Sequence, residues 1–226
     1  VEMATPNVYA DSIEWMHRIL AYRDSAVLSL HPHNDRGTAV AAAELGYMAG
    51  ADRIEGCLFG NGERTGNADL FAVVANLELK RGMKILPEGK LAETVRVSHA
   101  IADIANLPAN THQAYAGVSA FAHKAGLHAS ALKINPELYN HIDPTIVGND
   151  QRVLVTEMAG RASVELKSKE IGYDLSANKD GISAVVNKVK ELSERGMVLG
   201  AIGIGGAEGS VMSAGALMQL PIGNPK

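Results

Sequence analysis

Apolar residues in the first part of the chain recur at two spacings. Between Asp11 and Tyr22 they follow a helical stripe, with Asp11 placed to cap the helix. The run Ala26–Leu30 is short and mostly apolar, as is typical of a buried strand. The Ala-rich segment Thr38–Ala49 predicts a helix that stops at Gly50, where a left-handed cap would sit.

The same order of elements follows again. Arg53–Phe59 predicts a second strand, and Ala68–Arg81 predicts a helix with basic residues in its last turn and Gly82 beyond it. Two consecutive strand–helix units with short connections indicate a parallel sheet, because parallel strands need a crossover helix. The fold class predicted for this region is α/β.

The pattern changes after Gly82. Lys90–Asn106 predicts an amphipathic helix, residues 110–150 are loop-rich, and two further helices are expected at Glu157–Ile171 and Asn178–Arg195. From Met197 the chain is rich in Gly, Ala, Ser and Met and shows no stable periodicity. We therefore predict three segments, namely residues 1–84, residues 85–196 and a Gly-rich tail of unknown role at residues 197–226.

Composition narrows the range of partners. The 226 residues carry a net charge of −4 with both signs interspersed, which gives no electrostatic reason to expect nucleic acid or an anionic membrane. No apolar run approaches the roughly 20 residues that cross a bilayer. The single cysteine, Cys57, excludes an internal disulfide and fits a reducing compartment. A cytoplasmic protein is expected.

Candidate chemistry begins with the stretch His31–Gly37 (HPHNDRG). His31 and His33 stand two apart, so on a strand they point to one face. Pro32 cannot donate to a sheet ladder, which places the motif at the carboxyl end of the strand, where parallel α/β folds bind ligands. Two imidazoles there indicate a divalent metal site. On its own, His-x-His more often caps a loop through hydrogen bonds.

A second motif, Gly60–Asn67 (GNGERTGN), follows the next predicted strand and should reach the same rim. Its three glycines allow tight turns and close approach to a ligand. Asn67 offers an amide oxygen to a metal, and Glu63 forms a charge pair with Arg64. Alone this would be a Gly-rich surface loop, but the two motifs together favour a functional site.

The two motifs, with one helix and one strand between them, resemble the signature of the isopropylmalate, homocitrate and citramalate synthases. The resemblance covers about residues 1–195. It implies the last strands and helices of a TIM (β/α)₈ barrel, followed by a mostly helical post-barrel subdomain. It also implies that His31 and His33 bind the catalytic metal and that Asn67 lies in the metal's shell. Glu63, on the same rim, is predicted to be a catalytic residue.

A third motif, Phe121–His128 (FAHKAGLH), belongs to the same resemblance. In the family a His and a following Tyr of the post-barrel subdomain reach the active site of the partner subunit. His128 and Tyr139 fit that pattern, which implies an acid/base role and a homodimer. Without the resemblance they would be a loop histidine and a half-buried tyrosine. His123 is expected to be structural.

The family activity is condensation of acetyl-CoA with a 2-keto acid, supported by Mn²⁺, Zn²⁺ or Mg²⁺. The rim motifs resemble isopropylmalate synthases of leucine biosynthesis, which use 2-ketoisovalerate. Residues 86–195 resemble citramalate synthases of isoleucine biosynthesis, which use pyruvate. A related barrel lyase and a non-catalytic fragment that only dimerises are the remaining alternatives.

The chain departs from the family in its extent. A complete barrel needs about 250 residues, whereas in the family the His-x-His motif ends the seventh strand. The resemblance therefore places the start of this sequence near the sixth strand. It leaves out the Arg-Asp pair whose Asp is the third metal ligand. We expect a fragment that has no catalytic activity alone.

Overall fold

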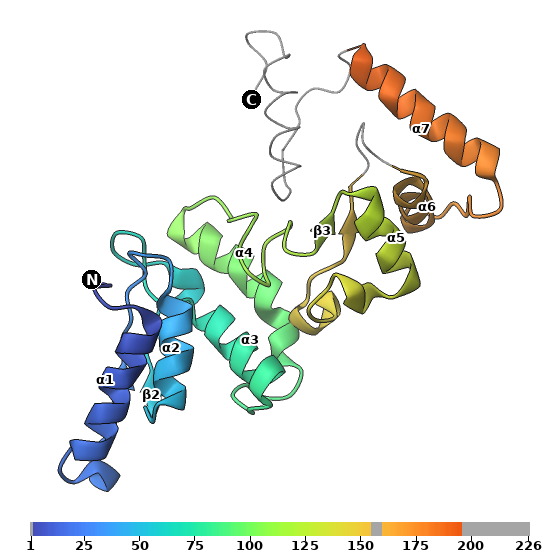
Figure 1. Cartoon of the computed structure of the whole chain (residues 1–226). Coiled ribbons are helices and arrows are strands. Elements are labelled where there is room, and N and C mark those ends of the chain that lie inside the picture. The colour runs from blue at the N-terminus through green and yellow to red at the C-terminus, as the bar shows by residue number, and fades with distance from the viewer. Residues whose placement is uncertain (1, 155–159, 196–226) are drawn as a thin grey trace. The chain divides into compact units, whose positions relative to one another are not determined.

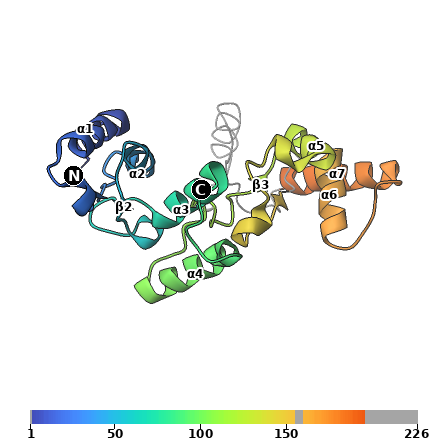
Figure 2. The same cartoon turned by 90° about the horizontal axis from the view of Figure 1, so that it is seen from below.

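The computed structural model describes residues 2–154 and 160–195. The chain divides into two compact units (Figures 1 and 2). The first unit comprises residues up to Ala120 together with Thr145–Asn149, and the second comprises Phe121–Pro144 and the chain from Asp150 onward. The predicted start of a helix at Glu157 and the Gly-rich tail lie outside the described residues.

The first unit is built on two parallel strands, β1 and β2. Ser29 pairs with Arg53 and Leu30 with Ile54, so the parallel arrangement predicted from the sequence is confirmed. In chain order, the helices, 3₁₀ turns and strands of this unit are α1 (Pro6–Ile19), η1 (Arg23–Ser25), β1 (Ser29–Leu30), α2 (Ala39–Met48), β2 (Arg53–Ile54), η2 (Leu58–Gly60), α3 (Leu70–Arg81), η3 (Lys90–Glu93) and α4 (Thr94–Ala105).

Helix α1 begins earlier than predicted. Thr5 is its N-cap residue and Pro6 its first helical residue, so Asp11 lies inside the helix and does not cap it. Proline is favoured at that position because its missing N–H needs no partner in the first turn and its φ is already helical. Helices α1 and α2 lie side by side in both views (Figures 1 and 2).

Close packing between α2 and β1 depends on a residue without a side chain. Leu30 is almost completely buried. A Cβ atom added to Gly46 of α2 would stand 2.6 Å from Cδ1 of Leu30, so any larger residue there would displace the Leu30 side chain. The neighbouring core consists of Ala39, Ala43, Ala68, Val73 and Leu77, and three of these five side chains are single methyl groups.

Segment Thr145–Asn149 joins the first unit by specific contacts. The Asn149 amide nitrogen donates to the carbonyl oxygens of Tyr115 and Gly117, at 2.8 and 3.0 Å. Gly148 has a φ of +70°, and a Cβ atom there would lie 2.0 Å from the carbonyl oxygen of Ala92. The segment therefore lies against both the loop at residues 115–117 and the turn η3.

The second unit contains another parallel pair, in which Ala122 and His123 face Arg152 and Val153. Helix α5 packs on α6 and α6 on α7 (Figure 1), and Lys133 of α5 forms an ion pair with Glu165 of α6. The elements are β3 (Ala122–His123), α5 (Gly126–Ile134), η4 (Pro136–Leu138), η5 (Pro144–Val147, shared with the first unit), β4 (Arg152–Val153), α6 (Arg161–Glu170) and α7 (Lys179–Glu194).

Helix α5 lies in the region that the sequence predicts to be loop-rich. Only Ala129 and Leu132 of its nine residues are buried, so its apolar stripe is too short to give a clear helical period. The two compact units are defined by contacts within the chain. The division into domains at residues 1–84, 85–196 and 197–226 stays a prediction. Within the described parts of the chain, no helix is long and apolar enough to span a membrane.

Candidate active site

Two loops meet where β1 and β2 end. His31 and His33 follow β1 directly, with Pro32 buried between them. The backbone N–H of Asn34 donates to the carbonyl of Gly66 at 2.9 Å, and that of Ala68 donates to the carbonyl of Pro32 at 3.0 Å. These bonds join the His31–Gly37 segment to the Gly60–Asn67 loop, as their order along a parallel sheet predicts.

Two glycines make the second loop possible. Gly66 has a φ of +96°, and a Cβ atom there would lie 1.9 Å from the carbonyl oxygen of Gly60. A Cβ atom on Gly62 would lie 2.1 Å from Oδ1 of Asn67. Glycine is therefore required at position 66, and a side chain at position 62 would displace the Asn67 amide oxygen.

The three predicted metal ligands come together. The rings of His31 and His33 have centroids 5.4 Å apart and are inclined at 75°. Nε2 of His31 lies 3.1 Å from Nδ2 of Asn67. Asn67 is only 6% exposed, whereas the His31 side chain is 53% exposed, so a rigid amide stands beside accessible imidazoles.

The far side of His31 faces a carboxylate that sequence reasoning missed. Oε2 of Glu55 lies 3.5 Å from Nδ1 of His31, while Oε1 accepts hydrogen bonds from Ser29 and Arg53. The Ser29 hydroxyl, and to a smaller extent Arg53 and His31, lower the pKa of Glu55. The sequence spacing could have indicated Glu55, because residues 53 and 55 are two apart and therefore point to the same face of the second strand.

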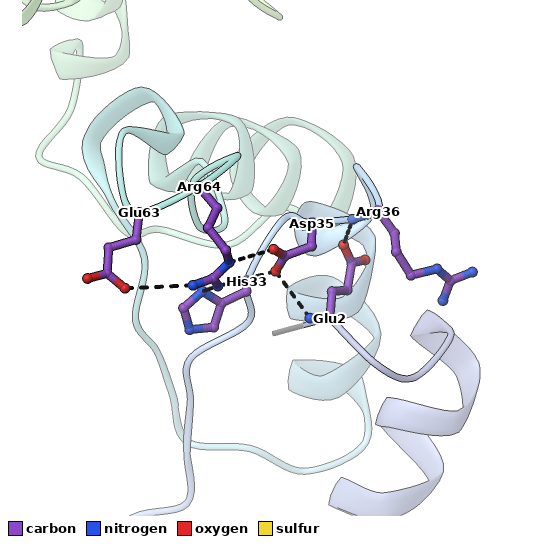
Figure 3. A network of polar contacts seen from close by, with 6 residues as sticks. All are labelled: Glu2, His33, Asp35, Arg36, Glu63 and Arg64. Atoms are coloured by element: carbon purple, nitrogen blue, oxygen red, sulfur yellow. Dashed lines mark hydrogen bonds and ion pairs between the residues drawn. The ribbon is translucent and has the colours of Figure 1, made fainter.

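Arg64 is the link between the two motifs (Figure 3). Its Nε donates to Oδ1 of Asp35 at 2.6 Å, and its Nη2 lies 2.9 Å from Nδ1 of His33. The hydrogen bond from Arg64 is the largest cause that lowers the pKa of Asp35 to about 2. Because a guanidinium only donates, Nδ1 of His33 accepts in this arrangement.

Glu63 lies at the outer tip of the loop. Its side chain is 87% exposed, and its Oε2 is 3.7 Å from Nη1 of Arg64. The charge pair expected from the sequence is therefore present but loose, and Asp35 is the closer partner of Arg64. Glu63 remains free to turn toward a ligand at this rim.

The donor set fits a divalent metal ion. Two imidazole nitrogens and an amide oxygen suit Mn²⁺ or Zn²⁺, and Mg²⁺ less well because it prefers oxygen ligands. Among the residues that the structure describes, no three His, Cys, Asp or Glu side chains form a metal-binding group. His31, His33 and Asn67 would thus leave coordination positions for other ligands.

The second unit brings the other predicted residues together. The rings of His128 and Tyr139 are stacked with centroids 4.0 Å apart. His123 lies edge-on to His128, with ring centroids 5.8 Å apart, and its Nε2 is 2.9 Å from Oδ1 of Asn140. Asn140 in turn donates to Gln151 at 2.8 Å, so polar side chains hold His123 beside the stacked pair.

Comparisons with known proteins identify both units. Residues 1–101 match the HMGL-like family, and residues 116–197 match the homocitrate synthase post-HMGL domain-like family. Relatives from several bacteria are named 2-isopropylmalate synthase or (R)-citramalate synthase. The chain belongs to the 2-isopropylmalate and citramalate synthase family. The resemblance inferred from the motifs is confirmed.

This chain is similar to citramalate synthases as well as to 2-isopropylmalate synthases. It is 57% identical to the (R)-citramalate synthase of Streptomyces coelicolor over 166 residues, which cover 74% of this chain and 31% of the relative. It is 44% identical to the 2-isopropylmalate synthase of Ralstonia pickettii over 210 residues, covering 86% of this chain and 36% of the relative. The chain therefore spans about a third of the length of these curated relatives.

Proposed function

We propose that this chain supplies part of the active site of an acyltransferase that condenses acetyl-CoA with a 2-keto acid and forms a carbon–carbon bond. The observation that carries this proposal is the meeting of His31, His33 and Asn67 at the carboxyl ends of two parallel strands. In parallel α/β folds this end of the sheet is where ligands bind.

We further propose that β1 and β2 are neighbouring strands of a (β/α)₈ barrel and that the second unit is its post-barrel subdomain. The match of residues 1–101 to the HMGL-like family supports the first assignment, and the match of residues 116–197 supports the second. The parallel register and the helices after each strand agree with a barrel segment.

In the proposed site, His31, His33 and Asn67 hold a divalent metal ion. Such an ion supplies Lewis-acid polarisation of a bound carbonyl oxygen. Asn67 is held in place by its burial and by the glycine turn, and its amide would rotate so that Oδ1 rather than Nδ2 faces the ion. Arg64, fixed by Asp35, presents a positive charge beside His33, where it can attract the carboxylate of a keto acid.

Acid/base work falls to exposed groups near the rim and to the second unit. Glu63 is an exposed carboxylate, a group suited to accepting a proton from the acetyl methyl. His128 and Tyr139 form a stacked pair that combines an imidazole with a phenol, and we propose that they serve the active site of a partner subunit in a homodimer. Both roles follow family resemblance together with these contacts.

For the keto acid, we favour 2-ketoisovalerate, which makes the enzyme a 2-isopropylmalate synthase, because the rim motifs resemble that group. Pyruvate is the second candidate, supported by the 57% identity to the (R)-citramalate synthase of Streptomyces coelicolor. The two differ in the branched side chain that the keto-acid pocket must accept.

The test is a free-thiol assay on the complete gene product that carries these residues. Acetyl-CoA, Mn²⁺ and either keto acid are supplied, and released CoA is measured. We expect turnover with one keto acid that is lost in His31→Ala and kept in His112→Ala, whose exposed histidine belongs to none of the sequence motifs. Equal turnover in His31→Ala and the unchanged protein would contradict the proposal.

A further inference from the structure

Glu55 is held in a fixed orientation on the strand face that carries His31. Its Oε1 accepts from Oγ of Ser29 at 2.8 Å and from Nη2 of Arg53 at 2.7 Å. Nε of Arg53 also donates to Oγ of Ser29 at 2.8 Å, which closes a ring of three side chains. One carboxylate oxygen is therefore anchored, and the other is left to face the imidazole.

The free oxygen selects a tautomer of His31. Oε2 of Glu55 lies 3.5 Å from Nδ1, which favours a proton on that nitrogen. On the opposite side of the ring, Nδ2 of Asn67 lies 3.1 Å from Nε2, and an amide nitrogen can only donate. Both contacts favour the same neutral form, with Nδ1 protonated and the lone pair of Nε2 directed toward Asn67.

We propose that Glu55 is a positioning residue for the metal site, which keeps His31 in the tautomer whose Nε2 binds the ion. The proposal rests on the proposed function only in treating His31 as a ligand. Carboxylates that accept from the second nitrogen of a ligating histidine fix its ring and raise its basicity. Ser29 and Arg53 act through Glu55, because their side chains bond to its Oε1 and to each other.

The tautomer is tested without any metal. The whole chain is labelled with ¹⁵N at histidine, His31→Gln assigns the His31 signals, and spectra are recorded at about pH 8.5, where histidine side chains of ordinary acidity are neutral. We expect Nδ1 to be protonated in the unchanged chain and in Glu55→Gln, whose amide oxygen still accepts. In Glu55→Ala the proton should move toward Nε2.

Two further variants show whether the effect runs through this ring of contacts. Ser29→Ala removes one anchor and should give a smaller shift in the same direction. Glu88→Gln changes an exposed carboxylate elsewhere and should leave His31 as it was. Circular dichroism confirms that each variant is folded. The same tautomer ratio in Glu55→Ala and the unchanged chain would overturn the proposal.

Metal affinity gives the second reading. Co²⁺ binding to the whole chain is measured by competition with a chelating dye, and Glu55→Ala should weaken it about 10–100-fold, as loss of an outer-shell partner does. Glu88→Gln should bind like the unchanged chain, and equal affinity in Glu55→Ala would overturn the role in metal binding. If the unchanged chain shows the expected tautomer but binds no Co²⁺, the proposed function fails while the positioning of His31 by Glu55 stands.

Discussion

Asp35 and Arg64 belong to different motifs, and an ion pair joins their side chains. Arg64 has a φ of +57°, a conformation that costs free energy for a residue with a side chain. Its bonds to Asp35 and His33 offset part of that cost. The pair is therefore the contact through which protonation can loosen the rim.

The Asp35–Arg64 pair predicts a stability that depends on pH. An aspartate that is unpaired in the unfolded chain has a pKa of about 3.9, whereas Arg64 lowers the pKa of Asp35 to about 2 in the folded chain. A lowered folded pKa means that the contribution is present above about pH 4 and is lost as the pH falls toward 2.

Thermal unfolding followed by circular dichroism between about pH 5 and pH 2 checks this. We expect Asp35→Asn to reduce the Tm above about pH 4 and to flatten the decline at lower pH. Glu88→Gln, which changes an exposed carboxylate, serves as the control. A decline that is as steep in Asp35→Asn as in the unchanged chain would contradict this account.

At the scale of elements, α3 fixes the loop that holds Asn67. Asp69 is the N-cap residue of this helix, and its Oδ1 accepts from the backbone N–H groups of Phe71 and Ala72. It is only 8% exposed, and this burial raises its pKa despite those bonds. The cap thus stands two residues after the candidate ligand and sets the end of the loop.

Removing this cap should destabilise the chain. Asp69→Ala leaves two backbone N–H groups without their acceptor and deprives Gln113 of its partner, so we expect the free energy of unfolding to fall by about 1–2 kcal/mol. Urea denaturation followed by circular dichroism measures the change. Asp103→Ala, at an exposed position of α4, should change it by less than about 0.5 kcal/mol. Equal effects of the two substitutions would contradict the role of the cap.

Sequence periodicity predicted the elements with long apolar stripes and missed the short ones. The helix expected at Ala68–Arg81 is α3, and the helix expected at Asn178–Arg195 is α7. Helix α5 was missed, since nine residues give too few turns for a period, and Pro6 as a helix start was overlooked in favour of Asp11. The strands expected at Ala26–Leu30 and Arg53–Phe59 pair over only two residues each, Ser29–Leu30 with Arg53–Ile54.

At the site, spacing predicted the meeting of His31, His33 and Asn67. It could do so because parallel strands end at one edge. Spacing did not predict Glu55, Asp35 or the preference of Arg64 for Asp35 over Glu63. Those contacts depend on side-chain rotamers and on a left-handed residue within the loop, which no periodic pattern encodes.

At the scale of the whole molecule, the two units carry separate parts of the proposed chemistry. The candidate metal ligands all belong to the first unit, and the His128–Tyr139 pair belongs to the second. The chain spans about a third of the relatives that it matches, so turnover is a property to test on the complete gene product. The proposed ligands His31, His33 and Asn67, in contrast, all belong to this chain, so their part in metal binding can be measured on it.

Manganese binding by the whole chain is the most direct test of the central claim. Titration with Mn²⁺, followed by the electron paramagnetic resonance signal of the free ion, gives the Kd. Loss of an outer-shell partner costs about 10–100-fold in affinity, so His31→Ala and His33→Ala should each weaken binding at least about tenfold, while His112→Ala leaves it unchanged. Unchanged affinity in both His31→Ala and His33→Ala would contradict the assignment of this rim as the metal site.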